Sequence, residues 1–62
     1  MYMITIRFKD HTEITVLEKS SEATTIKEGD GGVSAPMIRI GGYGGKTLVL
    51  EADVRAIVAQ EV

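Results

Sequence analysis

Cysteine is absent from this 62-residue chain and histidine occurs once, so neither a disulfide framework nor a structural zinc site is expected to stabilise it. A chain this short buries a smaller share of its surface than a larger domain, and its core is marginal. Small proteins without such cross-links usually gain stability from idealised packing or from association. Because 44% of the residues are nevertheless hydrophobic, we expect some of them to be buried between copies in a homodimer or higher oligomer.

Long apolar runs and runs of basic residues are absent as well. No stretch of about 18 apolar residues could form a transmembrane helix, and the N-terminus lacks the basic and apolar regions of a signal peptide. We therefore predict a cytoplasmic protein with no membrane contact. Seven basic and nine acidic residues give a net charge of −2, which argues against nucleic-acid binding through the phosphates.

Recognisable catalytic constellations are also missing. The Gly-x-Ser-x-Gly nucleophile motif does not occur, and the only histidine, His11, falls in a polar turn where nothing would exclude water. Two carboxylate pairs, Glu28 with Asp30 and Glu51 with Asp53, are typical of a polar turn and of a helix start respectively. The sequence therefore predicts no catalytic residue, no metal ion and no cofactor.

What the chain does contain is β-type alternation. Residues 2–8 and 13–18 alternate with period two, which predicts two half-buried strands paired as a hairpin. In the turn between them, His11 could accept the left-handed conformation that glycine more often takes. One face should carry the buried side chains, namely Ile4, Ile6, Phe8, Ile14 and Val16.

Three further strands follow at shorter spacing. Residues 23–27 predict a weak strand, residues 33–40 a strand interrupted by Pro36, and residues 46–50 a strand after a glycine-rich loop. Residues 51–62 fit two patterns. Hydrophobic residues at helical spacing favour a short helix, whereas a single helical turn followed by a last strand would suit an SH3-like barrel.

Together these elements predict one domain, residues 1–62, of a mainly β (α+β) class. We expect a small antiparallel sheet or an SH3-like barrel of four to five strands, with a short C-terminal helix or helical turn.

The glycine-rich loop is the most distinctive segment of the sequence. It consists of Gly41, Gly42, Tyr43, Gly44 and Gly45, followed by Lys46. A Walker phosphate loop is excluded because Ile40 stands where its first glycine belongs and a β-type run follows instead of a helix. The loop is read first as a hairpin turn. A second reading is a nest of amides that binds an anion beside Lys46, with Tyr43 stacking on a ligand or anchoring a partner.

Arg7 and Arg39 complete the set of candidate binding residues. Each lies opposite the apolar face of its predicted strand, and Met3 and Met37 share that parity. If the two strands were neighbours, a positive spot would form on a face that mixes methionine, leucine, arginine and threonine. Such a face would suit a protein partner or a dimer contact.

The leading functional hypothesis is therefore a small, non-enzymatic, oligomeric binding protein. Its partner would be another protein, or a small anionic ligand held by the loop, Lys46 and an arginine. The predicted architecture is similar to that of many small accessory proteins of phages and mobile elements, which implies an inhibitory or sequestering role by analogy alone. One alternative is a small β barrel that binds nucleic acid, although the acidic balance and the presence of only three aromatic residues weigh against it. The other is a structural subunit of a larger assembly.

Overall fold

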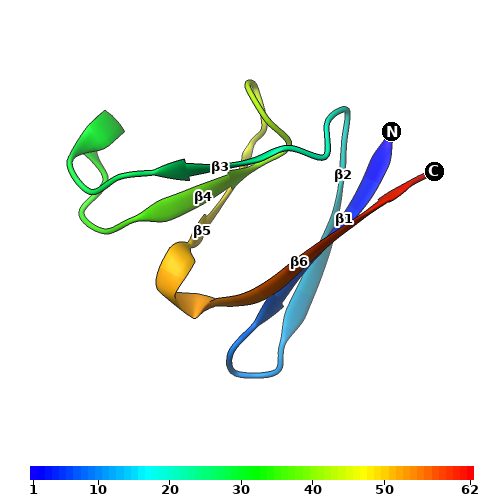
Figure 1. Cartoon of the computed structure of the whole chain (residues 1–62), viewed down its shortest axis with the longest axis horizontal. Coiled ribbons are helices and arrows are strands. Elements are labelled where there is room, and N and C mark those ends of the chain that lie inside the picture. Colours follow the sequence, from blue (N-terminus) through cyan, green and yellow to red (C-terminus); the bar gives the residue numbers. More distant parts are fainter.

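A computed structural model describes all residues, 1–62, as six strands and two single 3₁₀ turns (Figure 1). The elements in chain order are β1 (Tyr2–Phe8), β2 (Glu13–Glu18), β3 (Ala23–Ile26), η1 (Asp30–Gly32), β4 (Met37–Ile40), β5 (Thr47–Leu50), η2 (Glu51–Asp53) and β6 (Val54–Glu61). The strands form two antiparallel three-stranded sheets. Sheet A has the order β2-β1-β6, and sheet B has the order β3-β4-β5.

The predicted N-terminal hairpin is confirmed. β1 pairs antiparallel with β2, with Ile4 opposite Val16 and Ile6 opposite Ile14, so the apolar residues of both strands share one face. Ile4 and Ile6 are fully buried, whereas Ile14 is 41% exposed. The prediction that Ile14 is buried is therefore wrong, because β2 is an edge strand of sheet A and its Ile14 end is left uncovered.

The second predicted hairpin is also present. β4 pairs with β5 in antiparallel register, with Ile40 opposite Thr47, and the glycine-rich loop joins them. β3 pairs with the other edge of β4 and spans nearly the predicted range. The strand predicted over residues 33–40 is too long, since β4 begins at Met37, immediately after Pro36. Proline cannot donate to a ladder, and here it stands before the strand.

Of the two patterns that residues 51–62 fit, the helix is wrong, and the single helical turn followed by a last strand is present. A single 3₁₀ turn, η2, is followed by the eight-residue strand β6, which pairs with the second edge of β1. The register shifts at a bulge opposite Arg7 and Phe8, so Phe8 pairs with Val54 and Arg7 with Ala56. The pairing partner lies some fifty residues earlier in the chain, and this long-range ladder outweighs the local helical spacing.

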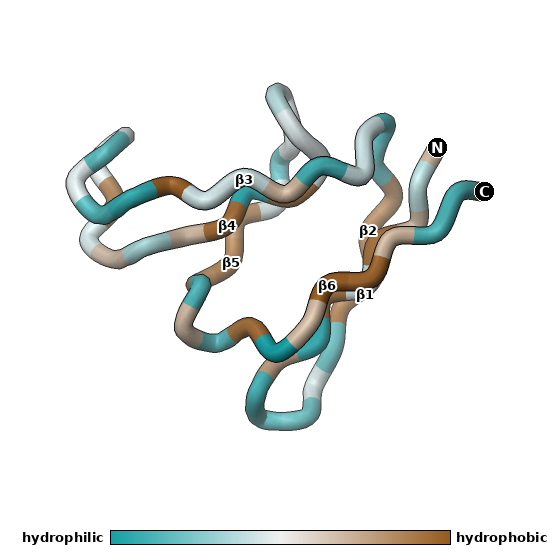
Figure 2. Tube along the Cα trace, in the orientation of Figure 1, coloured by the Kyte–Doolittle hydropathy of each residue, from teal (hydrophilic) through white to brown (hydrophobic).

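One small core lies between the sheets. Its fully or nearly fully buried members are Ile4 and Ile6 of sheet A and Ile40 and Val49 of sheet B. Six partly buried hydrophobic residues pack around them: Tyr2, Phe8, Val16, Ile38, Val54 and Ile57. Figure 2 shows hydrophobic segments along the inner strands and mostly hydrophilic residues in the turn of the first hairpin. The two chain ends lie side by side, where the Val62 amide donates to the Met1 carbonyl at 3.0 Å (Figure 1).

Candidate functional site

The glycine-rich loop connects β4 to β5 with a backbone that few other residues could adopt. Gly44 has a φ of 90°, in the left-handed region that disfavours L side chains. Gly45 is required for a different reason, since a Cβ atom there would lie 2.0 Å from the carbonyl oxygen of Ile40. The loop is therefore built around close contact between its own backbone and the end of β4, which is the hairpin reading of the segment.

The amides of this loop are largely occupied by the protein itself. Gly41 and Gly42 both donate to the carbonyl of Glu22 at 2.9 Å, and Gly45 donates to the carbonyl of Gly42 at 2.9 Å. An anion nest needs successive amides that converge on open space. Three of the amides that the nest reading would use are thus already satisfied, and the loop is closed on its own chain.

The side chains of the loop project outward from this closed backbone. Tyr43 is fully exposed and packs on neither sheet. A surface depression of about 530 Å³ lies beside it, and Tyr43, Gly41, Gly44 and Lys46 line one wall. The opposite wall comes from the N-terminal hairpin and carries both signs of charge; it consists of Met1, Leu17, Glu18 and Lys19. The loop and the start of sheet A therefore form one continuous surface.

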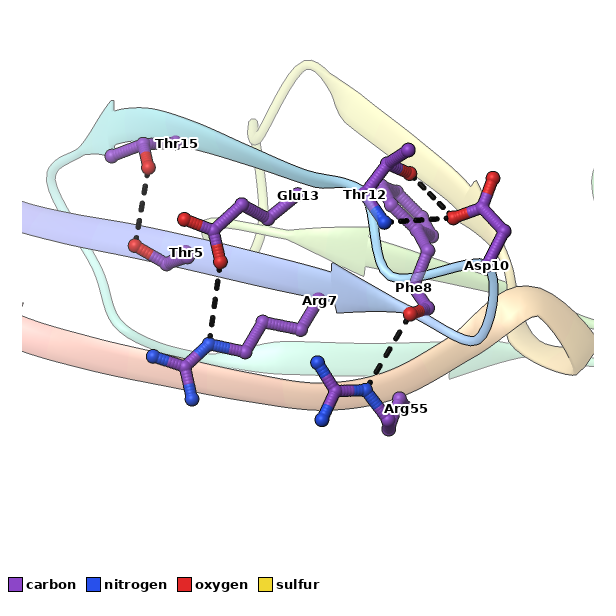
Figure 3. Close-up of polar contacts among 8 residues, drawn as sticks. All are labelled: Thr5, Arg7, Phe8, Asp10, Thr12, Glu13, Thr15 and Arg55. Carbon is purple, nitrogen blue, oxygen red and sulfur yellow. Dashed lines mark hydrogen bonds and ion pairs between the residues drawn. The ribbon is translucent and has the colours of Figure 1, made fainter.

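Arg7 and Arg39 do not join this surface as a pair. β1 lies in sheet A and β4 in sheet B, so the two strands are not neighbours and the predicted positive spot does not form. The Arg7 Nε atom lies 3.4 Å from Oε2 of Glu13, with both side chains about half exposed (Figure 3). Arg39 is half-buried and stands between Thr24 and Leu48 in the register of sheet B. Met3 and Met37 are separated in the same way.

The outer face of sheet A carries an apolar patch that sequence reasoning found only in part. Met3 lies directly opposite Leu17, and Thr5 lies between Thr15 and Val58. The patch, called here the terminal patch, consists of five exposed residues: Met1, Met3, Leu17, Val58 and Val62. Met3 and Leu17 are identified from parity, whereas Val58 and Val62 are not, because residues 51–62 fit both a helix and a last strand and their parity stays open. Met1 and Leu17 also line the depression beside Tyr43, so the patch continues into the glycine-rich loop.

Polar contacts occupy the other end of the same face. The hydroxyls of Thr5 and Thr15 lie 3.1 Å apart across the β1–β2 pair (Figure 3). Together with the Arg7–Glu13 ion pair they bound the terminal patch on the side of the hairpin turn. The outer face of sheet A is thus mainly apolar near the chain ends, where Gln60 opposite Met3 is an exposed polar residue, and polar near the turn.

A second depression, of about 540 Å³, lies at the hairpin turn. It is lined by Phe8, Lys9, Asp10, Thr12 and Asp53. The hydroxyl of Thr12 donates to Oδ1 of Asp10 at 2.6 Å and the Thr12 amide donates to the same atom at 3.0 Å (Figure 3). These two hydrogen bonds lower the pKa of Asp10 below its ordinary value of 3.8. The contacts serve the turn, and they assemble no pair of nucleophile and base.

No protein-family model matches this chain, and no curated protein or solved structure matches it significantly. No group of three or more histidine, cysteine, aspartate or glutamate side chains is placed to hold a metal ion. No helix of the chain has the length and apolar character needed to cross a membrane.

Proposed function

We propose that this chain is a small, non-enzymatic, homo-oligomeric protein that binds another protein through the terminal patch and Tyr43. The main observation is that two of the five exposed apolar residues of the patch, Met1 and Leu17, line one depression together with the fully exposed Tyr43. Contiguous apolar surface of this kind marks interaction sites on small proteins. Methionine and tyrosine are both enriched at such sites, the first for its adaptable shape and the second for its large, rigid contact area.

A protein partner has more support than a small anionic ligand. An anion at the loop would depend on Lys46 and Lys19, which lie beside the acidic Glu18, and on amides of which three are already bonded. A protein partner would use the exposed apolar side chains of the terminal patch. By analogy with small accessory proteins, the chain would act as an inhibitor that covers a surface its partner needs.

The scaffold behind this surface supports a finer description of the fold. We infer that the two sheets form an SH3-like barrel, because a single 3₁₀ turn precedes the last strand and that strand returns to β1. β3 follows β2 directly in the chain, and the two strands belong to different sheets, β2 to sheet A and β3 to sheet B. This connection supports the same description.

The test is to isolate the partner and to map its contact. Proteins captured by the tagged chain from its native cells would be purified, and each would be recombined with the pure chain for calorimetry. Leu17→Glu should weaken the reconstituted complex by about a hundredfold or more, since it places a charge in the centre of an apolar contact. Tyr43→Ala should weaken it by about tenfold or more, as expected for a tyrosine anchor.

Two control variants distinguish this surface from the alternative binding sites. Leu48→Glu is the control for Leu17→Glu, because Leu48 is also an exposed leucine, 45% against 61% for Leu17, and lies on the outer face of sheet B. Lys46→Ala is the control for Tyr43→Ala, since both side chains line the same wall. Loss of binding with Leu48→Glu alone would move the site to sheet B. Loss with Lys46→Ala alone would favour an anionic ligand at the loop.

A further inference from the structure

The free edge of β6 is the longest unpaired strand edge in the molecule. It spans Val54–Glu61, and it pairs only with β1, which leaves its other edge without a partner. The other three edge strands are shorter: β2 has six residues, and β3 and β5 have four each. Unpaired edges expose rows of N–H and C=O groups that can add a further strand, and proteins usually protect them with charge, proline or bulges.

The central part of β6 carries none of these protections. Ala56, Ile57, Val58 and Ala59 include no charged residue and no proline, and the only bulge lies earlier, at Arg55. The two charged residues of the strand stand at its ends, with Arg55 near the start and Glu61 as the last residue. Both are exposed, and the only ion pair within the chain joins Arg7 to Glu13 instead.

The direction of the backbone groups follows from the ladder with β1. In an antiparallel pair, alternate residues direct both their N–H and C=O groups toward the same neighbour. The Val62 amide donates to the Met1 carbonyl, so even-numbered residues of β6 are bonded to β1. The odd-numbered residues Ile57, Ala59 and Glu61 therefore direct their backbone groups toward the unpaired edge.

We propose that this edge of β6 pairs antiparallel with β6 of a second copy, about a two-fold axis at Val58. This inference rests on the homo-oligomeric state in the proposed function and specifies how the copies meet. In this register Ile57 exchanges backbone hydrogen bonds with Ala59 of the partner subunit, and Val58 faces its own equivalent. Because the two-fold pairing uses the same edge of both copies, it closes as a dimer.

Charge complementarity selects this register over its neighbours. A two-fold axis at Val58 places Arg55 opposite Glu61 of the partner subunit, and the symmetry repeats the contact at the other end. A two-residue shift in either direction removes both opposite-charge contacts. The bulge ends regular pairing at Arg55, whose Nε atom donates to the Phe8 carbonyl at 3.5 Å within the chain (Figure 3). The side chain is exposed, so it can exchange this long contact for the carboxylate of Glu61 of the partner subunit. The pairing also brings Val58 of the terminal patch to the centre of a six-stranded sheet.

Proline substitution tests the edge directly. Ala59→Pro removes a donor that faces the unpaired edge and leaves the bonds between β6 and β1 in place. In light scattering of the full chain we expect twice 6.7 kDa for the wild type and 6.7 kDa for Ala59→Pro, with native circular dichroism in both. Thr15→Pro is the control, because Thr15 lies on the edge strand β2 with its amide directed away from β1; this variant should remain dimeric. A folded Ala59→Pro variant that stays dimeric would overturn the proposal.

Charge reversal tests the register even if Ala59→Pro does not fold. Arg55→Glu and Glu61→Arg should each raise the dimer dissociation constant by about tenfold, since each turns two attractive contacts into two repulsive ones. The double variant should restore the wild-type constant. Additive weakening in the double variant would overturn the register. A dimer that dissociates with Leu17→Glu but not with Ala59→Pro would overturn β6 pairing alone, whereas a wild-type chain that is monomeric at all concentrations would also overturn the homo-oligomeric state.

Discussion

His11 is the only residue other than glycine with a positive φ, at 70°, as the turn chemistry predicted. Left-handed backbone costs an L-residue about 1–2 kcal/mol, and glycine escapes this cost at an entropic penalty of about 0.5–1 kcal/mol. His11→Gly should therefore stabilise the chain by about 0.5 kcal/mol. His11→Val should destabilise it by about 1 kcal/mol or more, because a β-branched residue tolerates this conformation poorly. Denaturant unfolding of both variants measures the difference, and a stabilised His11→Val would contradict the assigned turn.

Asp10, in the same turn, makes the stability of the folded chain depend on pH. Its pKa is lowered chiefly by the Thr12 hydroxyl and then by the Thr12 amide, so the charged form is favoured in the folded chain. A lowered folded-state pKa contributes stability that is present above the ordinary value of 3.8 and is lost as the pH falls through the folded value. We expect Asp10→Asn to be less stable than the wild type at neutral pH, with the gap closing in acid below pH 3.8. Thermal unfolding across this range checks it, and a gap that widens in acid would contradict the hydrogen bonding described.

At the scale of elements, Ile6 and Ile14 show that strand pairing does not by itself bury a side chain. The two residues face each other across β1 and β2, yet Ile6 is fully buried and Ile14 is 41% exposed. Ile6→Ala should cost about 2–5 kcal/mol through lost burial and a residual cavity. Ile14→Ala is the matched control and should cost about 1 kcal/mol, because much of its side chain already contacts water. Equal losses in chemical denaturation would show that the core is not centred on β1.

Some of these elements could be predicted from the local sequence, and others depend on distant pairing partners. The first hairpin was predictable because period-two alternation stands on both sides of a short polar turn. The sequence could not decide between the last strand and a helix, because hydrophobic residues of this segment match helical spacing and the pairing partner, β1, lies at the other end of the chain. The separation of Arg7 from Arg39 was equally hidden. Parity gives the face of each strand but not the sheet to which the strand belongs.

The whole molecule is thin, with extents of 35 × 27 × 12 Å, and its core has only four buried hydrophobic residues. Nine large hydrophobic side chains remain exposed, and five of them form the terminal patch. A small β domain with this balance has little stability of its own. In the proposed dimer, burial between copies would add substantially to the free energy of unfolding. If the proposed dimer forms, folding and association are one equilibrium, and the unfolding temperature should report both.

The unfolding temperature should therefore rise with protein concentration. When a dimer unfolds to two separate chains, a hundredfold increase in concentration stabilises the dimer by about 2.7 kcal/mol. For a domain of this size, that corresponds to an increase of roughly 10 °C or more in the unfolding temperature. Calorimetric scans at increasing concentrations measure the shift, with reversibility checked by a second scan of each sample. A midpoint that stays constant would mean that the four-residue core and its partly buried neighbours stabilise each chain alone, and that the exposed apolar surface is available entirely for another protein.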